Sequence, residues 1–268
     1  MVKGGAMNRK LDDCEVDDHN LEGGKARVVK TACVIGATSS LSVVLCRELA
    51  KAGWNLHLIA RDEGRLKEIE TDIMVRHEGV VVTTQIVDLS SKRLNPKMVA
   101  KEIGCPDGLF LLAGDMGSYD LFDSKNIEKV TRVTYVAPVQ IIAEVAKVMS
   151  VSGSGSIVFV SSVAGDRGRG VNAPYGAAKA ALTAFASGLR QKLYGSGVNV
   201  LTVKPGFVDT SLTWGMDSPL MASRGAVVRQ VIKAVDKRRQ VIYTPSIWMI
   251  IMFVIRHIPE WLFKRLKF

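Results

Sequence analysis

Three side chains that can place a proton on a carbonyl oxygen stand close together in the second half of the chain. Ser162 follows an apolar run, Tyr175 comes thirteen residues later, and Lys179 is four residues beyond the tyrosine. Residues four apart share one face of a helix, so the lysine ammonium would favour the phenolate and lower the tyrosine pKa. The serine hydroxyl can donate a hydrogen bond to the same carbonyl oxygen. The spacing therefore predicts general acid catalysis by Tyr175, assisted by Ser162 and Lys179.

A second group of residues has the arrangement of a phosphate-binding loop. Gly36 follows the apolar run Ala32–Ile35 and precedes a helical pattern that starts at Ser40. Amides at a helix N-terminus attract a pyrophosphate, and a glycine permits the tight turn before them. Because Ser40 and Ser42 stand where a glycine-rich loop has its later glycines, an ordinary strand–turn–helix fits as well. The candidate cofactor contacts in this loop are Gly36, Thr38, Ser39, Ser40 and Leu41.

Two charged residues at later strand ends indicate which nucleotide would bind. Arg61 follows the second apolar run, where a cation suits the 2′-phosphate of NADP and a carboxylate would suit the ribose of NAD. Asp88, followed by Leu89, ends the third run and can accept a hydrogen bond from the adenine amino group. The alternatives are a surface arginine and an aspartate that caps a turn. NADP(H) is the favoured cofactor.

These residues require elements that bring strand ends and helix starts to one edge. Apolar runs rich in β-branched residues alternate with longer helical patterns, which is typical of an α/β protein. The predicted strands are Ala32–Ile35, Trp54–Ile59, Val80–Val87, Leu109–Ala113, Ser156–Val160, Val198–Val203 and Val241–Tyr243. The predicted helices are Ser40–Ala52, Glu63–His77, Lys125–Met149, Ala173–Tyr194 and Ala222–Arg238. We expect one Rossmann-like domain, a doubly wound parallel sheet of about seven strands with helices on both faces.

The charge of the chain is unevenly distributed. The 268 residues include 36 basic and 26 acidic side chains, a net charge of +10, and the 47% apolar content excludes a disordered chain. Residues 222–268 hold ten basic and two acidic side chains, a net charge of +8. No nucleic-acid-binding motif accompanies this excess, so an anionic membrane or a solvated surface is favoured over nucleic acid.

The remaining composition bounds the compartment. Residues 1–30 are polar with balanced charge and are expected to form a disordered leader without a secretory signal. The four cysteines lack metal-like or disulfide-framework spacing, which predicts no metal site and a reducing, cytoplasmic environment. No apolar run reaches the roughly 20 residues of a membrane-spanning helix.

Residues 244–268 form a basic, apolar tail. Trp248 and Trp261 flank an apolar stripe, and basic residues are interleaved near its end. An apolar body with aromatic flanks and basic heads suits an interfacial helix at the inner face of the cell membrane. Packing of the same stripe on the domain or on a partner subunit is the alternative. The stripe consists of Ile247, Ile250, Ile251, Val254 and Ile255.

With these motifs, residues 31–243 resemble the short-chain dehydrogenase/reductase family. The resemblance implies a nicotinamide cofactor, a homo-oligomer, and catalytic roles for Ser162, Tyr175 and Lys179, the last two also contacting the cofactor. Thr134 stands where the family has a fourth catalytic residue, an asparagine. Further cofactor contacts that the resemblance implies are Ala113 and Gly114, which end a motif whose two asparagines are leucines here, and Pro205, Gly206, Val208 and Thr210 in the nicotinamide loop.

Two segments, residues 161–182 and 243–268, resemble a narrower group, the decaprenylphosphoryl-2-keto-β-D-erythro-pentose reductases. This resemblance implies an NADPH-dependent reduction of a lipid-linked 2-keto sugar in cell wall biogenesis, with a flavin oxidase as partner. Other lipid-like ketones, namely a 3-ketosphinganine, a 3-oxoacyl chain or a steroid, are alternatives with the same chemistry. A catalytically weak scaffold is a further alternative, because the loop lacks its later glycines and Thr134 replaces the family's asparagine. Residues 210–222 are expected to form a mobile substrate lid.

Overall fold

The structure, a computed structural model, describes residues 29–210, 215 and 218–266. Most of the expected leader and the central part of the expected lid lie outside the described residues.

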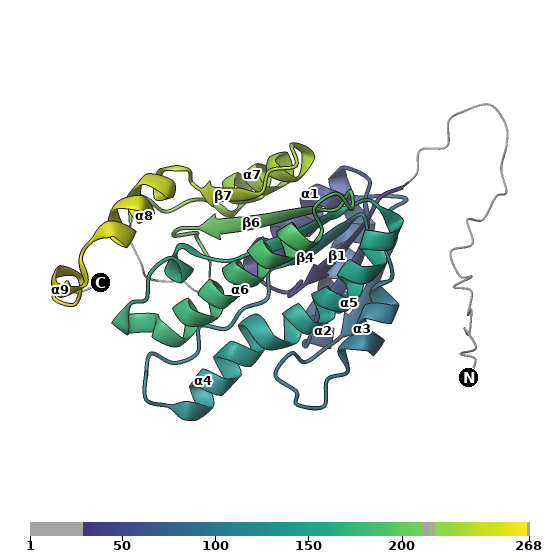
Figure 1. The fold of residues 1–268 in the computed structure, drawn as a ribbon. Helices are drawn as coiled ribbons and strands as arrows, with labels where there is room; N and C mark the ends of the chain where they lie inside the picture. The colour runs from purple at the N-terminus through teal and green to yellow at the C-terminus, as the bar shows by residue number, and fades with distance from the viewer. Residues whose placement is uncertain (1–28, 211–214, 216–217, 267–268) are drawn as a thin grey trace, which may run out of the picture.

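A seven-stranded parallel sheet forms the centre of the molecule (Figure 1), which confirms the predicted fold class. The strand order β3-β2-β1-β4-β5-β6-β7 reverses direction at β1, as in doubly wound folds. The inner strands are buried on both faces, which explains their continuous apolar runs. The strands are β1 (Thr31–Ile35), β2 (Asn55–Ala60), β3 (Val82–Ile86), β4 (Gly108–Leu111), β5 (Ser156–Val160), β6 (Asn199–Pro205) and β7 (Val241–Thr244).

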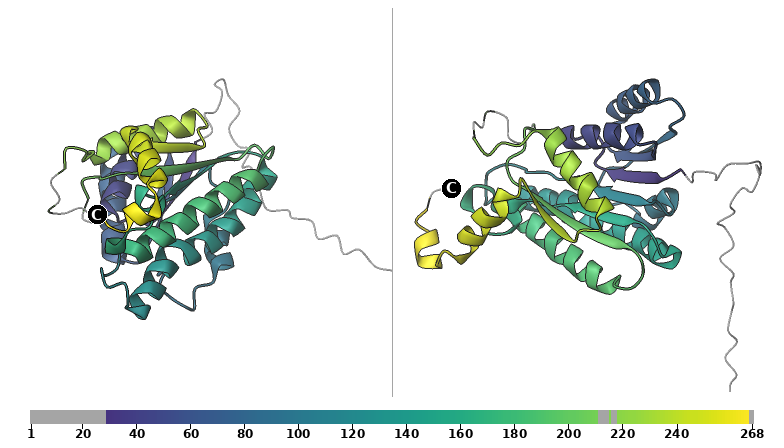
Figure 2. Two further views of the ribbon diagram at one scale, coloured as in Figure 1. Left: turned by 60° about the vertical axis from the view of Figure 1, so that its left-hand side comes forward. Right: turned by 90° about the horizontal axis from the view of Figure 1, so that it is seen from above.

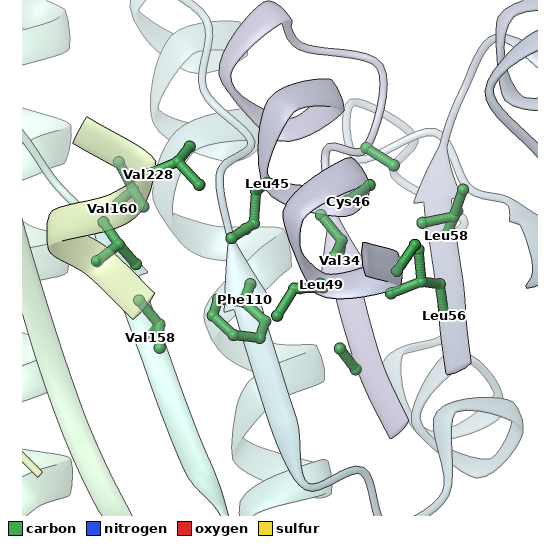
Figure 3. Packing of buried hydrophobic residues seen from close by; sticks show 14 of the residues in the cluster. Val34, Leu45, Cys46, Leu49, Leu56, Leu58, Phe110, Val158, Val160 and Val228 are labelled. Atoms are coloured by element: carbon green, nitrogen blue, oxygen red, sulfur yellow. The ribbon is translucent and has the colours of Figure 1, made fainter. Parts of the chain in front are cut away.

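Helices cover both faces of the sheet, and each layer encloses its own apolar core. On one face, α1 (Ser40–Lys51), α2 (Glu63–Arg76) and α7 (Arg224–Asp236) bury their apolar stripes. Figure 3 shows Leu45 and Leu49 of α1 beside Phe110 of β4, on this face. The opposite face is covered by α3 (Pro96–Ile103), α5 (Ala137–Ser152) and α6 (Ala173–Lys192).

Two helical segments differ from the sequence prediction. The short helix α3 was not predicted, because it has only eight residues and follows a polar loop. The predicted helix Lys125–Met149 is α4 (Ser124–Thr131) and α5 joined by a π-helical turn, η1 (Arg132–Val136). This continuous run of 29 residues has the length and composition of a membrane span, but half of its apolar window is buried within the fold. Its apolar residues are explained by the packing of α5 on the sheet.

The tail forms two helices, α8 (Ile247–His257) and α9 (Glu260–Phe263), at the end toward which the strands point (Figures 1 and 2). Trp248 and Met252 are buried against Val163 and pack with Phe207. The opposite face of α8 exposes Met249, Ile250, Phe253 and Val254. One face of α8 therefore packs on the domain, which is one of the two alternatives, and the other face is exposed to solvent.

Arg167 binds the C-terminal end of α8 through hydrogen bonds. Arg167, from the loop after β5, donates from Nη1 to the carbonyl oxygens of Ile255, Arg256 and Ile258 at 3.1, 3.0 and 2.7 Å. Its Nη2 lies 2.7 Å from a carboxylate oxygen of Glu260, and its guanidinium lies over the Phe263 ring. The last carbonyls of a helix lack intrahelical partners, so this arginine caps α8 and orients α9.

Candidate functional site

A cavity of about 390 Å³ lies where the carboxyl ends of β1, β4, β5 and β6 meet. Doubly wound sheets bind their ligands in this crevice, beside the point where the strand order reverses. The cavity brings together most of the predicted residues, from the loop after β1 to the loop after β6. Those in its lining are Ser39, Ser40, Leu41, Gly114, Ser162, Tyr175, Lys179, Pro205, Gly206, Val208 and Thr210.

Ser162 and Tyr175 reach the cavity from two neighbouring elements. Ser162 follows β5 and caps the short 3-10 helix η2 (Val163–Gly165), where its Oγ accepts a hydrogen bond from the Ala164 amide at 3.1 Å. Tyr175 lies in the first turn of α6, which begins with a proline at a helix-starting position. Its ring is only 9% exposed and packs with Val130, Ala164 and Ala178. The hydroxyl groups of Ser162 and Tyr175 are therefore held by a capped 3-10 helix and by a buried helix turn.

Lys179 lies one turn further along α6 and is only 3% exposed. Its Nζ donates a hydrogen bond to the Val160 carbonyl oxygen at 2.8 Å and lies 5.6 Å from the centre of the Tyr175 ring. A Cβ atom added at Gly114 would lie 3.3 Å from this Nζ, so the glycine leaves the ammonium accessible from the cavity. The i, i+4 pair expected on one face of a helix is thus present.

Burial shifts the pKa values of both groups. Burial raises the pKa of Tyr175 to about 12, against a lowering effect of its hydrogen bond with Ser162. Burial lowers the pKa of Lys179 to about 8. The direction at Tyr175 is opposite to the sequence prediction, because removing the phenolate from water outweighs the nearby ammonium, which is directed at a backbone carbonyl.

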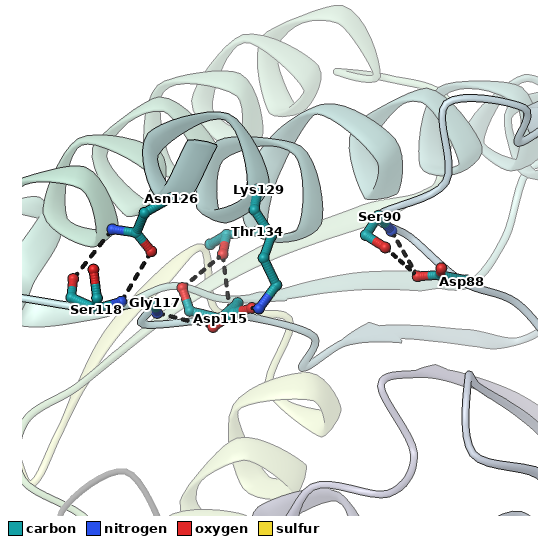
Figure 4. Close-up of polar contacts among 8 residues, drawn as sticks. All are labelled: Asp88, Ser90, Asp115, Gly117, Ser118, Asn126, Lys129 and Thr134. Atoms are coloured by element: carbon teal, nitrogen blue, oxygen red, sulfur yellow. Dashed lines mark hydrogen bonds and ion pairs between the residues drawn. The ribbon is translucent and has the colours of Figure 1, made fainter. Parts of the chain in front are cut away.

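Thr134 does not reach the cavity lining. It is fully buried in the π-helical turn η1, where its Oγ1 accepts a hydrogen bond from the Asp115 amide at 3.0 Å. The same hydroxyl donates to the Asp115 carbonyl at 3.3 Å (Figure 4). Its methyl group would lie 3.9 Å from a Cβ at Gly114. Thr134 therefore holds the loop after β4 through the backbone of Asp115, outside the cavity lining.

The loop after β1 has the close approach expected of a phosphate-binding turn. Gly36 has φ +87°, and a Cβ there would lie 2.6 Å from the Ala113 amide nitrogen. The serine that replaces the last glycine is satisfied internally: Ser42 is fully buried, and its Oγ donates to the Gly36 carbonyl at 2.8 Å. Ser39 caps α1 and accepts from the Ser42 amide at 3.2 Å. These bonds explain how Ser42 replaces a glycine without lining the cavity, whereas Ser40 lies in the lining.

The residues predicted for the adenosine half lie beyond the cavity. Arg61 is exposed where β2 ends, and Leu89 is buried. The Oδ1 atom of Asp88 accepts hydrogen bonds from the amide and hydroxyl of Ser90 at 2.9 and 2.7 Å (Figure 4). These bonds lower the pKa of the Asp88 carboxyl, and the charge of Arg61 acts in the same direction. Asp88 thus caps the turn, the alternative left open by the sequence.

The loop after β6 is supported by the tail. Gly206 packs against the indole of Trp248 so closely that an added Cβ would collide with Nε1, and the ring of Phe207 meets that indole edge-on at 5.1 Å. Trp248 was expected at a membrane surface, and its contact with Gly206 was not predicted. No sequence pattern links positions so far apart in the chain.

Further side chains line the cavity without having been predicted. They include Met116, Val163, Ala164, Arg169, Val171, Asn172 and Phe207. Most belong to loops, where no helical or strand period singles out one residue. Only their place between Ser162 and Tyr175 in the sequence could have indicated that Arg169 and Asn172 line the site.

Comparisons with known proteins agree with this geometry. Residues 30–220 match the family model described as short chain dehydrogenase. An uncharacterized oxidoreductase of Mycobacterium tuberculosis is 31% identical over 240 residues, which cover 87% of this chain and 95% of the relative. A short-chain dehydrogenase from Sphingobium yanoikuyae, solved in complex with NADPH, has a TM-score of 0.73 at 24% identity, covering 87% of this chain and 97% of that chain. A bulky-bulky ketone specific alcohol dehydrogenase from Comamonas testosteroni has a TM-score of 0.72 at 22% identity, covering 87% and 96%. At these identities the two structures establish a common fold.

Proposed function

Because the chain belongs to the short-chain dehydrogenase family, we propose that it reduces a ketone to a secondary alcohol with NADPH. The observation that carries this proposal is that Ser162, Tyr175 and Lys179 line one cavity together with the loop that starts α1. The NADPH in the Sphingobium yanoikuyae relative supports the same choice of cofactor here.

The residues at the cavity fit a dinucleotide. Gly36 and Ala113 bring two loops into contact at the N-terminus of α1, where the first turn holds no acidic side chain. The amides of this turn, with Ser39 and Ser40, would hold a pyrophosphate. Arg61 would meet the 2′-phosphate. Leu89 would meet the adenine, together with the carboxylate oxygen of Asp88 that does not cap the turn. The residues proposed for the nicotinamide half are Gly114, Tyr175, Lys179, Pro205, Gly206, Val208 and Thr210.

The proposed catalytic roles follow from the positions of the side chains. When bound, NADPH supplies the hydride for the carbonyl carbon. Tyr175 donates its phenolic proton to the carbonyl oxygen, and its raised pKa keeps that proton in place at neutral pH. Ser162 orients the same oxygen by a hydrogen bond, and the charged Lys179 stabilises the phenolate that remains. Thr134 takes part through the loop after β4, by holding Asp115.

For the substrate, we propose a lipid-linked 2-keto sugar, on the resemblance of residues 161–182 and 243–268 to reductases of such substrates. The apolar side chains of Met116, Val163 and Phe207 in the cavity lining support a lipid-like part. A flavin oxidase that produces the ketone and a homo-oligomeric enzyme belong to the same proposal. A 3-ketosphinganine, a 3-oxoacyl chain or a steroid ketone would use the same chemistry.

We also propose that residues 31–243 form the reductase domain and that residues 244–268 attach it to the inner face of the cell membrane. The exposed apolar residues of α8 and the exposed Arg256, Lys264 and Arg265 support attachment to an anionic surface.

Removal of the Tyr175 hydroxyl tests the proposed function. Tyr175→Phe keeps the ring and its packing, so we expect NADPH affinity, followed by nucleotide fluorescence, to be unchanged. Turnover of a ketone, followed by NADPH absorbance, should fall by about 10²- to 10⁴-fold, the usual contribution of a general acid. Tyr194→Phe, at an exposed tyrosine after α6, is the matched control and should retain full activity.

The same measurements separate an enzyme from a scaffold of the same fold. A protein that does not bind NADPH at all would contradict the enzyme proposal. Equal turnover by Tyr175→Phe and the unsubstituted protein would contradict the catalytic roles.

A further inference from the structure

One positive charge at the cavity has no partner among the residues that the structure describes. Arg169 caps the 3-10 helix η3 (Gly170–Asn172) and lines the cavity a few residues before Tyr175. Its guanidinium makes no hydrogen bond or ion pair within the part of the chain that the structure describes, although five donors are available. The neighbouring cations differ: Arg167 is bound to the tail, and Lys204 pairs with Asp166 at 2.5 Å.

Among the described residues, no negative charge neutralises Arg169. Among the described residues that line the cavity, none is acidic. Arg169 is half-buried, and burial lowers the pKa of its guanidinium with no carboxylate acting in the other direction. Keeping an unpaired cation partly out of water costs free energy. An anionic ligand that enters the cavity would remove this cost.

A second polar side chain, that of Asn172, lines the cavity without a hydrogen-bond partner among the described residues. Asn172 precedes α6, but its carboxamide makes no capping hydrogen bond, and the described residues offer it no other partner. Asn172 also lines the cavity, three residues from Arg169. A guanidinium and a carboxamide that line the same cavity can both donate hydrogen bonds to an oxyanion bound there.

We propose that Arg169, with Asn172, binds an oxyanion group of the ketone substrate, a phosphate ester or a carboxylate. This inference rests on the proposed function and adds specificity to it. The cavity lining also includes the apolar side chains of Met116, Val171 and Phe207, so the preferred substrate is an amphiphilic anion. The adenosine phosphate is assigned elsewhere, to Arg61 at the end of β2.

Binding of small probes tests the inference without turnover. Calorimetry on the NADPH-loaded protein would compare octyl phosphate, octanoate and octanol. We expect Arg169→Gln to weaken binding of one or both anions by about 10- to 100-fold, the usual range for a lost hydrogen bond to a charged group, and to leave octanol unchanged. The stronger anion identifies the class, and Arg169→Lys should retain part of the affinity, since lysine keeps the charge without the planar fork.

Kinetics with two matched pairs of ketones give a second readout. Dihydroxyacetone phosphate would be compared with dihydroxyacetone, and 5-oxohexanoate with its methyl ester. Arg169→Gln should raise KM for the anionic member alone, while the NADPH affinity stays unchanged. Arg229→Gln, at an exposed arginine on α7, removes the same charge away from the cavity and should behave like the unsubstituted protein.

The outcomes distinguish the two proposals. If no ketone is reduced, the proposed function fails, and the calorimetry still decides the role of Arg169. Equal anion binding by Arg169→Gln and the unsubstituted protein, or no anion binding by either, would overturn the inference. A lowered melting temperature of Arg169→Gln, with octanol and anion binding weakened together, would indicate a structural role and overturn it as well.

Discussion

At the residue scale, the central feature is a buried phenol next to a buried amine. Burial moves the pKa of Tyr175 up to about 12 and that of Lys179 down to about 8. As the pH rises, the lysine therefore loses its proton first, and the tyrosine keeps its proton well above neutral pH. At pH 7 both groups carry the protons that reduction requires, the tyrosine as acid and the lysine as cation.

This order predicts the pH dependence of the reaction. The rate of ketone reduction should be level below pH 8 and fall above it by about tenfold per unit, because the charged fraction of a single group declines in that way. The value of kcat/KM for a neutral ketone, measured from pH 6 to 10, would check this. A profile that remains level up to pH 10 would contradict the role of a charged Lys179.

The residues of the site differed in how far the sequence could predict them. Ser162, Tyr175 and Lys179 could be predicted because a strand end and a helix face determine their relative positions. Gly36 could be predicted because its turn tolerates no side chain. Arg169 could not be predicted, because what distinguishes it is that none of the described residues lining the cavity is acidic. No sequence period shows which side chains from different loops come together.

At the scale of elements, α8 belongs to the tail and also supports the loop after β6, which lines the cavity. Trp248 fills the space over Gly206, and its Nε1 is buried without a hydrogen-bond partner among the described residues. The sequence predicted the stripe on this helix but not which side of it would be buried. That choice depends on Val163, Phe207 and Tyr243, which surround the indole only after the sheet has formed.

Substitution of Trp248 separates its packing from its polar group. Trp248→Ala should lower the free energy of unfolding by about 3 to 5 kcal/mol, since a buried indole leaves a large cavity. It should also weaken NADPH binding, because Gly206 loses its support. Denaturant unfolding and nucleotide fluorescence would measure the two effects.

The conservative variant is the control for this experiment. Trp248→Phe should cost no more than about 1 kcal/mol, since a phenyl ring retains most of the packing and removes a buried N–H that lacks an acceptor. An equally large loss in both variants would contradict this account of the indole and indicate that Nε1 has a partner.

At the scale of the whole molecule, the tail and the cavity lie at the same end of the sheet (Figures 1 and 2). Val163 and Phe207 contact the buried face of α8 and also line the cavity. The exposed apolar face of α8 therefore lies on the opposite side of this helix from the residues that line the cavity. Arg256, Lys264 and Arg265 are exposed in the tail, whereas Lys237, Arg238 and Arg239 precede β7, at the opposite end of the sheet, so only part of the excess charge lies near this face. A protein attached through this face would hold its cavity close to the lipid surface that carries the proposed substrate.

Attachment to a membrane can be tested without disturbing the fold. Deletion of the tail would also remove Trp248 from Gly206, so the suitable variant replaces only the exposed side chains Ile250 and Phe253 by serine.

The unsubstituted protein should co-sediment with phosphatidylglycerol vesicles and less with phosphatidylcholine vesicles. Co-sedimentation should also decrease at high salt, because screening weakens each basic contact. The double variant should lose at least about tenfold in partitioning, since apolar burial supplies much of the binding. Val151→Ser, at an exposed valine of α5, should bind as before, and equal sedimentation of the double variant would contradict attachment through α8.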